Sequence, residues 1–148
     1  MSKILVVDDD TSILKVLKMR LEASGYDVSV AASIGEALKA AKDTTFDLAL
    51  LDYKLGDGNG VELMEKLQPM MPRIQIIILT AYGTIENAVK AMKQGAYTYL
   101  TKPFDDAQLM LQVKNCLERA TYQKKSKHFE IWFQINWDSK ILSVEAIQ

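Results

Sequence analysis

The fold is decided by the stretch ILVVDDD at residues 4–10, in which an aliphatic run stops abruptly at three acidic residues. Short β-branched runs of this kind are typical of buried strands in a sheet. After the aspartates, apolar residues recur at helical spacing from Ile13 to Leu21, and Gly25 follows at the position of a helix-ending glycine. The beginning of the chain therefore predicts a strand that leads directly into a helix.

The same alternation of an apolar run and a helical pattern continues to about residue 121. Ser33 and Glu36 have the spacing of a capping box, a turn-rich loop covers 56–60, and Pro69 and Pro72 are expected to close the third helix. Five strands alternating with five helices predict an α/β fold with a doubly wound parallel sheet. The remaining strands are expected at 26–31, 48–51, 74–79 and 96–100, and the remaining helices at 33–42, 61–68, 84–94 and 105–121.

Composition places the protein in a broad class. The chain has 148 residues, of which 49% are hydrophobic and 25% charged, and its formal net charge is −1. These values are ordinary for one globular domain and exclude collagen-like or wholly disordered chains. A net charge this close to zero gives no long-range electrostatic attraction to nucleic acid or to an anionic membrane. The one cysteine permits no intrachain disulfide and the apolar runs are too short to span a bilayer, so we expect a cytoplasmic protein.

The composition changes after residue 121. Residues 124–127 are basic and linker-like, and from Ile131 onward apolar side chains alternate with polar ones at the period of a strand. We therefore expect a domain at 1–121, followed by a basic linker and an apolar tail at 122–148. The second part is too short for a complete DNA-binding domain, so we expect no direct nucleic-acid binding by this chain and no membrane association.

Chemically active side chains follow four of the five expected strands. The first strand ends in Asp8-Asp9, the third in Asp52 and the fourth in Thr80, and the fifth is followed by Lys102. Functional sites of such sheets lie beyond the carboxyl ends of the strands, so these side chains are expected to converge there. Clustered carboxylates repel one another unless a cation lies between them, and Mg²⁺ prefers oxygen ligands of this kind. Together with a lysine suited to phosphoryl groups and an aspartate that could be phosphorylated, the set favours phosphoryl transfer.

Each of these residues also has a purely structural interpretation. Asp10 is better explained as the N-cap of the first helix than as a metal ligand, whereas for Asp8 and Asp9 the two interpretations are evenly balanced. Asp52 or Thr80, taken singly, could belong to a loop or a turn. The combination of suitable side chains at four strand ends favours one site over separate structural roles.

Four short segments carry a resemblance to a known family. They are Val6-Val7-Asp8-Asp9, Leu50-Leu51-Asp52, Thr80-Ala81 and Ala96-Tyr97-Thr98-Tyr99-Leu100-Thr101-Lys102-Pro103. Through them, residues 2–121 resemble the receiver domain of two-component response regulators, most closely the receivers of enhancer-binding transcription activators. The resemblance implies a flavodoxin-like five-stranded sheet in the spatial order 2-1-3-4-5, five helices, and a cis peptide bond before Pro103. One departure is Leu55-Gly56, where many receivers carry Met-Pro; it affects the loop and leaves the site intact.

The resemblance also implies how the acidic residues would work. Asp52 would accept a phosphoryl group from the phosphohistidine of a sensor kinase. Asp8, Asp9 and Asp52 would hold Mg²⁺, together with the backbone carbonyl of Lys54.

The matched residues on the last two strands would bind the phosphoryl group and respond to it. Lys102 and Thr80 would contact the phosphoryl oxygens, and Thr80 with Tyr99 would form the switch. The surface made by the last strand and its two flanking helices would then change shape, and two copies of the chain could pair through it. The expected function is a phosphoacceptor module that undergoes only its own autophosphorylation and autodephosphorylation, with no turnover of other substrates.

A second function remains open from the residues. The segment Asp8-Asp9-Asp10-Thr11 resembles the start of Mg²⁺-dependent haloacid-dehalogenase phosphatases. In that case Asp8 would be the nucleophile and Asp10 the acid/base. Ser12 stands where those enzymes carry a threonine, and Asp52 and Lys102 would be left without a role.

Overall fold

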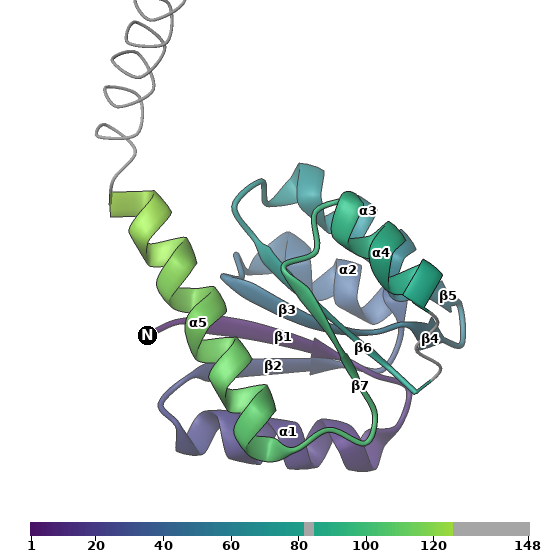
Figure 1. Ribbon diagram of the computed structural model, residues 1–148, viewed down its shortest axis with the longest axis horizontal. Helices are drawn as coiled ribbons and strands as arrows, with labels where there is room; N and C mark the ends of the chain where they lie inside the picture. The colour runs from purple at the N-terminus through teal and green to yellow at the C-terminus, as the bar shows by residue number, and fades with distance from the viewer. Residues whose placement is uncertain (82–84, 126–148) are drawn as a thin grey trace, which may run out of the picture. The chain divides into compact units, whose positions relative to one another are not determined.

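The computed structural model describes residues 1–81 and 85–125, which are built around one five-stranded sheet (Figure 1). Neighbouring strands of this sheet are all parallel, in the order β2-β1-β3-β6-β7. Numbered within the sheet alone, this is the order 2-1-3-4-5, so the expected flavodoxin-like topology is confirmed. The strands are β1 (Lys3–Val7), β2 (Asp27–Ala31), β3 (Leu48–Asp52), β6 (Gln75–Thr80) and β7 (Thr98–Thr101).

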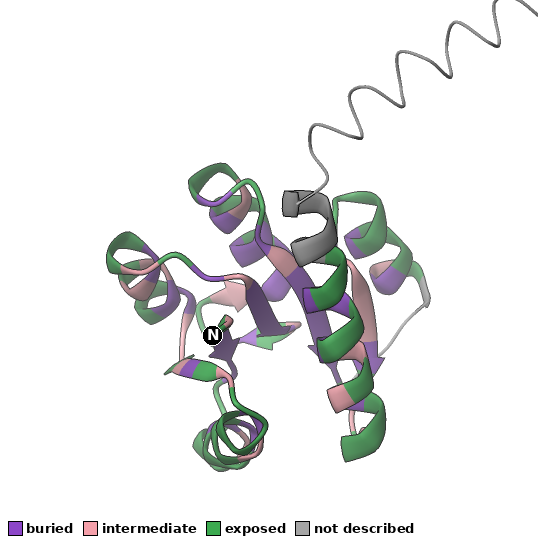
Figure 2. Ribbon diagram, turned by 90° about the vertical axis from the view of Figure 1, so that its left-hand side faces the viewer, coloured by how far each residue is buried: buried purple, intermediate pink, exposed green. Residues whose placement is uncertain are grey.

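Helices cover both faces of the sheet, as Figures 1 and 2 show. One face packs against α1 and the first part of α5, and the other packs against α2, α3 and α4. No helix within residues 1–81 and 85–125 is long and apolar enough to cross a membrane. The helices are α1 (Thr11–Ala23), α2 (Ile34–Asp43), α3 (Gly60–Met70), α4 (Ile85–Lys93) and α5 (Asp106–Lys125).

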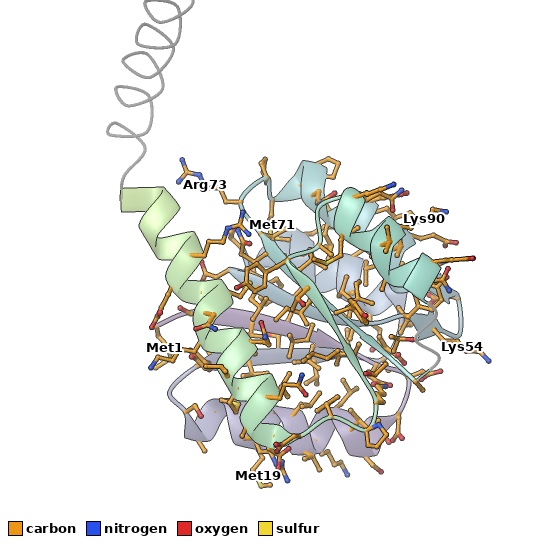
Figure 3. All side chains as sticks on the ribbon, in the orientation of Figure 1. Met1, Met19, Lys54, Met71, Arg73 and Lys90 are labelled. Atoms are coloured by element: carbon orange, nitrogen blue, oxygen red, sulfur yellow. The ribbon has the colours of Figure 1, made fainter. Side chains whose placement is uncertain are left out.

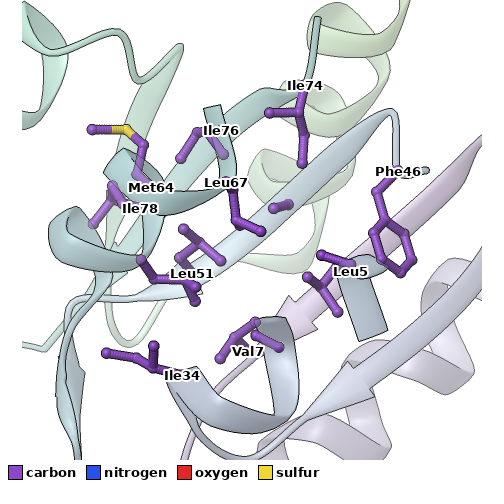
Figure 4. Packing of buried hydrophobic residues seen from close by; sticks show 14 of the residues in the cluster. Leu5, Val7, Ile34, Phe46, Leu51, Met64, Leu67, Ile74, Ile76 and Ile78 are labelled. Atoms are coloured by element: carbon purple, nitrogen blue, oxygen red, sulfur yellow. The ribbon is translucent and has the colours of Figure 1, made fainter. Parts of the chain in front are cut away.

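The aliphatic run of β1 lies at the centre of two apolar clusters. Leu5 and Val7 point into the cluster beneath α2, α3 and α4, which Figure 4 shows from close by, and Ile4 and Val6 point into the cluster beneath α1 and α5. All four side chains are fully buried. Burial on both faces explains why this strand is a continuous apolar run rather than an alternating one. Each such side chain contributes about 1.5–3 kcal/mol to folding by leaving water.

The third helix does not end where the sequence predicted. It runs through Pro69 to Met70, so the expectation that Pro69 closes it is wrong. Proline lacks the N–H that residue 69 would donate to the preceding turn, so α3 loses one hydrogen bond there, but the backbone stays helical to Met70. The amide of Met71 donates to the carbonyl oxygen of Leu67 at 2.8 Å and completes the last turn.

The expected loop at 56–60 is more ordered than the sequence indicated. It contains a small antiparallel ribbon of β4 (Lys54–Leu55) and β5 (Gly58–Asn59), in which Leu55 is buried. Figure 1 shows the ribbon beyond the end of β3. The segment that follows Asp52 is therefore held in a defined conformation.

The predicted domain boundary at residue 121 falls inside α5 (Asp106–Lys125). This helix continues past residue 121 to Lys125, and internal contacts divide the chain into Met1–Leu117 and Glu118–Gln148. The boundary at residue 121 stays a prediction. The strand expected after Ile131 lies outside the described residues.

Gly60 marks the closest approach of α3 to β3. A Cβ atom at this position would lie 2.5 Å from the carbonyl oxygen of Asp52, which is well inside van der Waals contact. We therefore expect Gly60→Ala to lower the free energy of unfolding by about 1–3 kcal/mol through overpacking, measured by urea denaturation.

Gly56→Ala is the matched control for this substitution. Nothing lies within 4 Å of the corresponding position, and the backbone there is not left-handed. The control is expected to remain within about 0.5 kcal/mol of the wild type. Equal stability of the two variants would show that the contact between α3 and β3 is looser than described.

Candidate functional site

The sheet brings the predicted site residues to one edge. Asp52 is the last residue of β3 and Thr80 the last of β6, while Asp8 and Lys102 directly follow β1 and β7. Parallel register aligns these ends, with Val7 opposite Leu51 and Thr80 opposite Thr101. The convergence expected from the sequence is therefore present.

Lys102 connects the two buried aspartates. Its Nζ atom lies 2.6 Å from Oδ2 of Asp8 and 3.4 Å from Oδ1 of Asp52. The side chains are 16%, 1% and 9% exposed, respectively, so the ammonium group and both carboxylates are largely shielded from water. Charges in such surroundings persist only when they are paired, and the lysine supplies the pairing for both acids.

The position of Asp8 is fixed from its other side. Its Oδ1 atom accepts a hydrogen bond of 2.9 Å from the backbone N–H of Asp10. The carboxylate of Asp10 turns toward α1 instead and accepts from the N–H groups of Ser12 and Ile13. Asp10 is thus the N-cap of α1, as preferred from the sequence, and not part of the site.

Burial changes the protonation of Asp52. Removal from water, reinforced by the nearby charge of Asp8, raises the pKa of Asp52 from 3.8 to about 6, although the ammonium of Lys102 opposes the rise. For Lys102, burial works to lower the pKa, but the hydrogen bond to Asp8 and the charges of both aspartates outweigh it and raise the pKa. The lysine therefore stays protonated near neutral pH. The ionised form of Asp52 is destabilised relative to that of an exposed aspartate.

Three carboxylates form a group that suits a hard cation. One oxygen each from Asp8, Asp9 and Asp52 lie within 4.8 Å of one another, with Asp9 exposed and the other two buried. All three donors are anionic oxygens, which matches the preference of Mg²⁺, an ion that takes few carboxylates and keeps part of its water. The residues present therefore fit this ion.

The remaining predicted residues lie on β6, β7 and β4. Thr80 is buried, and its carbonyl oxygen accepts from the N–H of Lys102 at 2.7 Å. Tyr99 is half-buried on β7 and packs against the cluster beneath α2, α3 and α4. Lys54 lies exposed on β4, and Figure 3 shows its side chain pointing away from the body of the domain. The peptide bond between Lys102 and Pro103 is cis, as expected.

Two contributions near the site were missed from the sequence. The carboxylate of Asp57 accepts from the backbone N–H groups of Ile34 and Gly35 at the start of α2. Gly60 donates its N–H to the carbonyl oxygen of Tyr53 at 2.8 Å and allows the close approach of α3. The turn-forming Asp57-Gly58 pair was a visible signal, but its partner on α2 depends on the tertiary fold.

Comparison with known proteins places these features in a family. A model of the response regulator receiver domain matches residues 4–114. The chain is 38% identical over 117 residues to the transcriptional regulatory protein GlrR of Escherichia coli K12, an alignment that covers 79% of this chain and 26% of that protein. It therefore spans about a quarter of the length of such relatives.

Solved receiver structures are similar to this chain in both fold and sequence, and two of them bear on the site. The solution structure of the beryllofluoride-activated NtrC4 receiver domain dimer has a TM-score of 0.77 and 37% identity, over 81% of this chain and 99% of that one. A response regulator from Burkholderia pseudomallei, with a phosphorylated aspartic acid, a calcium ion and citrate, has a TM-score of 0.73 and 31% identity. The latter match covers 84% of this chain and 73% of that one.

The raised pKa of Asp52 predicts a pH-dependent stability in the absence of metal. Between about pH 4 and pH 6 the folded protein binds the Asp52 proton more tightly than the unfolded chain does, so this group lowers the free energy of unfolding as the pH rises. We expect Asp52→Asn to be more stable than the wild type at pH 7.5 by about 1–3 kcal/mol, and the gain to shrink toward pH 4.5. Urea denaturation in EDTA measures both values.

Asp27→Asn serves as the control, since Asp27 is exposed on β2. Its free energy of unfolding is measured at the same two pH values, so that the effect of an Asp-to-Asn exchange on the surface can be subtracted. A stability gain of Asp52→Asn that did not change with pH would contradict the assigned pKa of Asp52.

Proposed function

The chain belongs to the response regulator receiver domain family of two-component systems, and from this premise we propose that Asp52 is its phosphoacceptor. The observation that carries the proposal is the position of the Asp52 carboxylate, at a strand end, 3.4 Å from the ammonium of Lys102 and clustered with Asp8 and Asp9. The phosphorylated aspartic acid of the Burkholderia pseudomallei regulator supports the same chemistry here.

We assign the binding of Mg²⁺ to the acidic group. Asp8, Asp9 and Asp52 would hold the ion, with the backbone carbonyl of Lys54 as a further ligand. When bound, the ion would neutralise charge on the phosphoryl oxygens. The calcium ion of the Burkholderia pseudomallei regulator is consistent with a divalent cation in a receiver.

The transfer itself uses residues of this chain in defined roles. An oxygen of the ionised Asp52 carboxylate attacks phosphorus, the bond from phosphorus to the imidazole nitrogen of the kinase histidine breaks, and its electron pair returns to the imidazole. Lys102 pairs with the phosphoryl oxygens, and the hydroxyl of Thr80 donates a hydrogen bond to them. Hydrolysis of the acyl phosphate by water restores the Asp52 carboxylate and ends the signal. We expect no turnover of other substrates.

Phosphorylation would switch the surface formed by α4, β7 and α5. The modification adds about −1.5 to −2 charges beside Thr80, which would be drawn toward them. Tyr99 would swing into the space that Thr80 vacates, and the two states would differ in the shape of this surface. Val89 and Met92 of α4 and Leu111 of α5 are large apolar side chains that are already exposed there.

The partners follow from this scheme. A sensor histidine kinase would supply the phosphoryl group, and two copies of the chain would pair through the α4, β7 and α5 surface; the dimeric state of the activated NtrC4 receiver supports such pairing. We propose that the module works in the cytoplasm as the receiving part of a transcriptional regulator and that it does not itself bind nucleic acid.

The phosphatase alternative has no support. Asp10, which would be its acid/base, is engaged as the N-cap of α1. Asp8, which would be its nucleophile, is bound on one oxygen by Lys102 and on the other by the N–H of Asp10. The family match concerns receivers and not phosphatases.

The proposal predicts one phosphoryl group per chain after incubation with acetyl phosphate and Mg²⁺. Intact-mass spectrometry is expected to show this addition in the wild type and its loss in Asp52→Asn and in EDTA. Asp47→Asn is the matched control, because Asp47 is an aspartate at the opposite ends of the strands and lies outside the acidic group. Phosphorylation of Asp52→Asn at the wild-type rate would overturn the assignment.

A further inference from the structure

Asp57 holds the start of α2 with both of its carboxylate oxygens. Oδ1 accepts from the N–H of Ile34 at 3.0 Å, and Oδ2 accepts from the N–H of Gly35 at 3.2 Å. These donors, that of Ile34 foremost, lower the pKa of Asp57, so the group remains ionised at neutral pH. Residues more than twenty positions apart in the sequence are thereby joined in a two-point contact.

This contact is additional to the capping that α2 already has. The hydroxyl oxygen of Ser33 accepts from the N–H of Glu36 at 3.1 Å, and the carboxylate of Glu36 accepts from the N–H of Ala32 at 2.7 Å. The helix therefore has an N-cap of its own from neighbouring residues. What Asp57 adds is a connection from α2 to the segment that follows Asp52.

That segment is the ribbon of β4 and β5, and Asp57 lies in its turn. The register places Lys54 opposite Asn59 and Leu55 opposite Gly58, so Gly56 and Asp57 form the connection between the two strands. The ribbon also lies directly against α2, because a Cβ atom on Gly58 would be 2.7 Å from Cδ1 of Ile34.

The base of the ribbon is fixed separately. Gly60 donates its N–H to the carbonyl oxygen of Tyr53 at 2.8 Å, and Tyr53 donates its own N–H to the carbonyl oxygen of Leu79 at 2.6 Å. Lys54 thus lies between an anchored base and a tip that Asp57 anchors. Its backbone has little freedom as long as both anchors hold.

We propose that Asp57 is a positioning residue for the divalent-cation site, which it serves by fixing the ribbon so that the carbonyl of Lys54 can act as a ligand. This inference rests on the proposed function, in which that carbonyl and three carboxylates hold Mg²⁺. Asp57 does not touch the cation. It acts through the ribbon, as outer-shell partners of metal ligands generally do.

The test is the dissociation constant for Mg²⁺ alone, measured by titration calorimetry on the full chain at pH 7. Asp57→Ala removes both acceptors and is expected to raise the constant about tenfold, the lower end of the range for outer-shell partners. Asp57→Asn keeps one acceptor oxygen, so a smaller rise is expected. Asp47→Asn, which removes an aspartate that accepts from the N–H of Lys3 at 2.8 Å, is expected to leave the constant unchanged.

Salt separates positioning from simple loss of negative charge. Both Asp57 variants lose the same charge, so a long-range electrostatic effect would weaken Mg²⁺ binding equally in both. Such an effect would also fade at about 1 M ionic strength, where the screening length is about 3 Å. Positioning predicts instead that Asp57→Ala remains the weaker of the two at high salt. Equal affinities of the two variants, or a return to the wild-type constant in salt, would overturn the inference.

Two further variants distinguish this inference from the function on which it rests. Asp52→Asn is expected to lose most Mg²⁺ affinity; wild-type affinity in that variant would overturn both the metal site and the role of Asp57. If Asp52→Asn behaves as expected and Asp57→Ala binds like the wild type, only the role of Asp57 is wrong. Far-UV circular dichroism checks that each variant folds. If Asp57→Ala does not fold, Asp57→Asn takes its place in the test. An Mg²⁺ dissociation constant of Asp57→Asn equal to that of Asp47→Asn would then overturn the inference.

Discussion

The acidic site depends on the ammonium group of Lys102, which pairs with both Asp8 and Asp52. Two carboxylates that are almost completely buried face each other at the edge of a sheet, and their repulsion alone would make the site unstable. The lysine comes from the end of β7, at the border of the sheet, and reaches Asp8 after β1, beyond both β6 and β3. It therefore keeps an acidic site intact and links three strand ends at the same time.

The two sides of the site differ in the side chains that they carry. Asp8 and the segment after Asp52 are held by several backbone contacts, through Asp10, Asp57 and Gly60. On the other side, α4 and β7 carry half-buried and exposed apolar side chains such as Tyr99 and Met92. A charge added at Asp52 would act on both sides, and a change among the exposed side chains of α4 and β7 would alter a surface that a partner can contact.

Much of this could be predicted from the sequence because the relevant signals are local. Strands buried on both faces appear as short aliphatic runs, and parallel topology brings the residues after each run to one edge. The sequence alone therefore predicts that Asp8, Asp52, Thr80 and Lys102 meet there. The N-cap role of Asp10 followed from its place before a helix.

The features that escaped prediction depend on tertiary contacts. The two hydrogen bonds from the start of α2 to Asp57 join residues more than twenty positions apart, on elements that meet only in the folded chain. The continuation of α3 through Pro69 depends on how near the helix is to its end, which periodicity alone does not locate. The direct bond from Lys102 to Asp8 was likewise unexpected, because the sequence suggested only a role for the lysine toward a phosphoryl group.

The ionised form of Asp52 is destabilised by burial and by the charge of Asp8, and it is partly stabilised by Lys102. The most direct measurement is an NMR titration of the side-chain carboxyl carbon of Asp52 in the metal-free protein, repeated in Lys102→Gln. We expect an apparent pKa of about 6 in the wild type and a higher value in the variant, because the favourable charge is gone while burial remains. A pKa near 3.8 in the wild type, or an unchanged pKa on removal of the lysine, would show that these interactions are wrongly assigned.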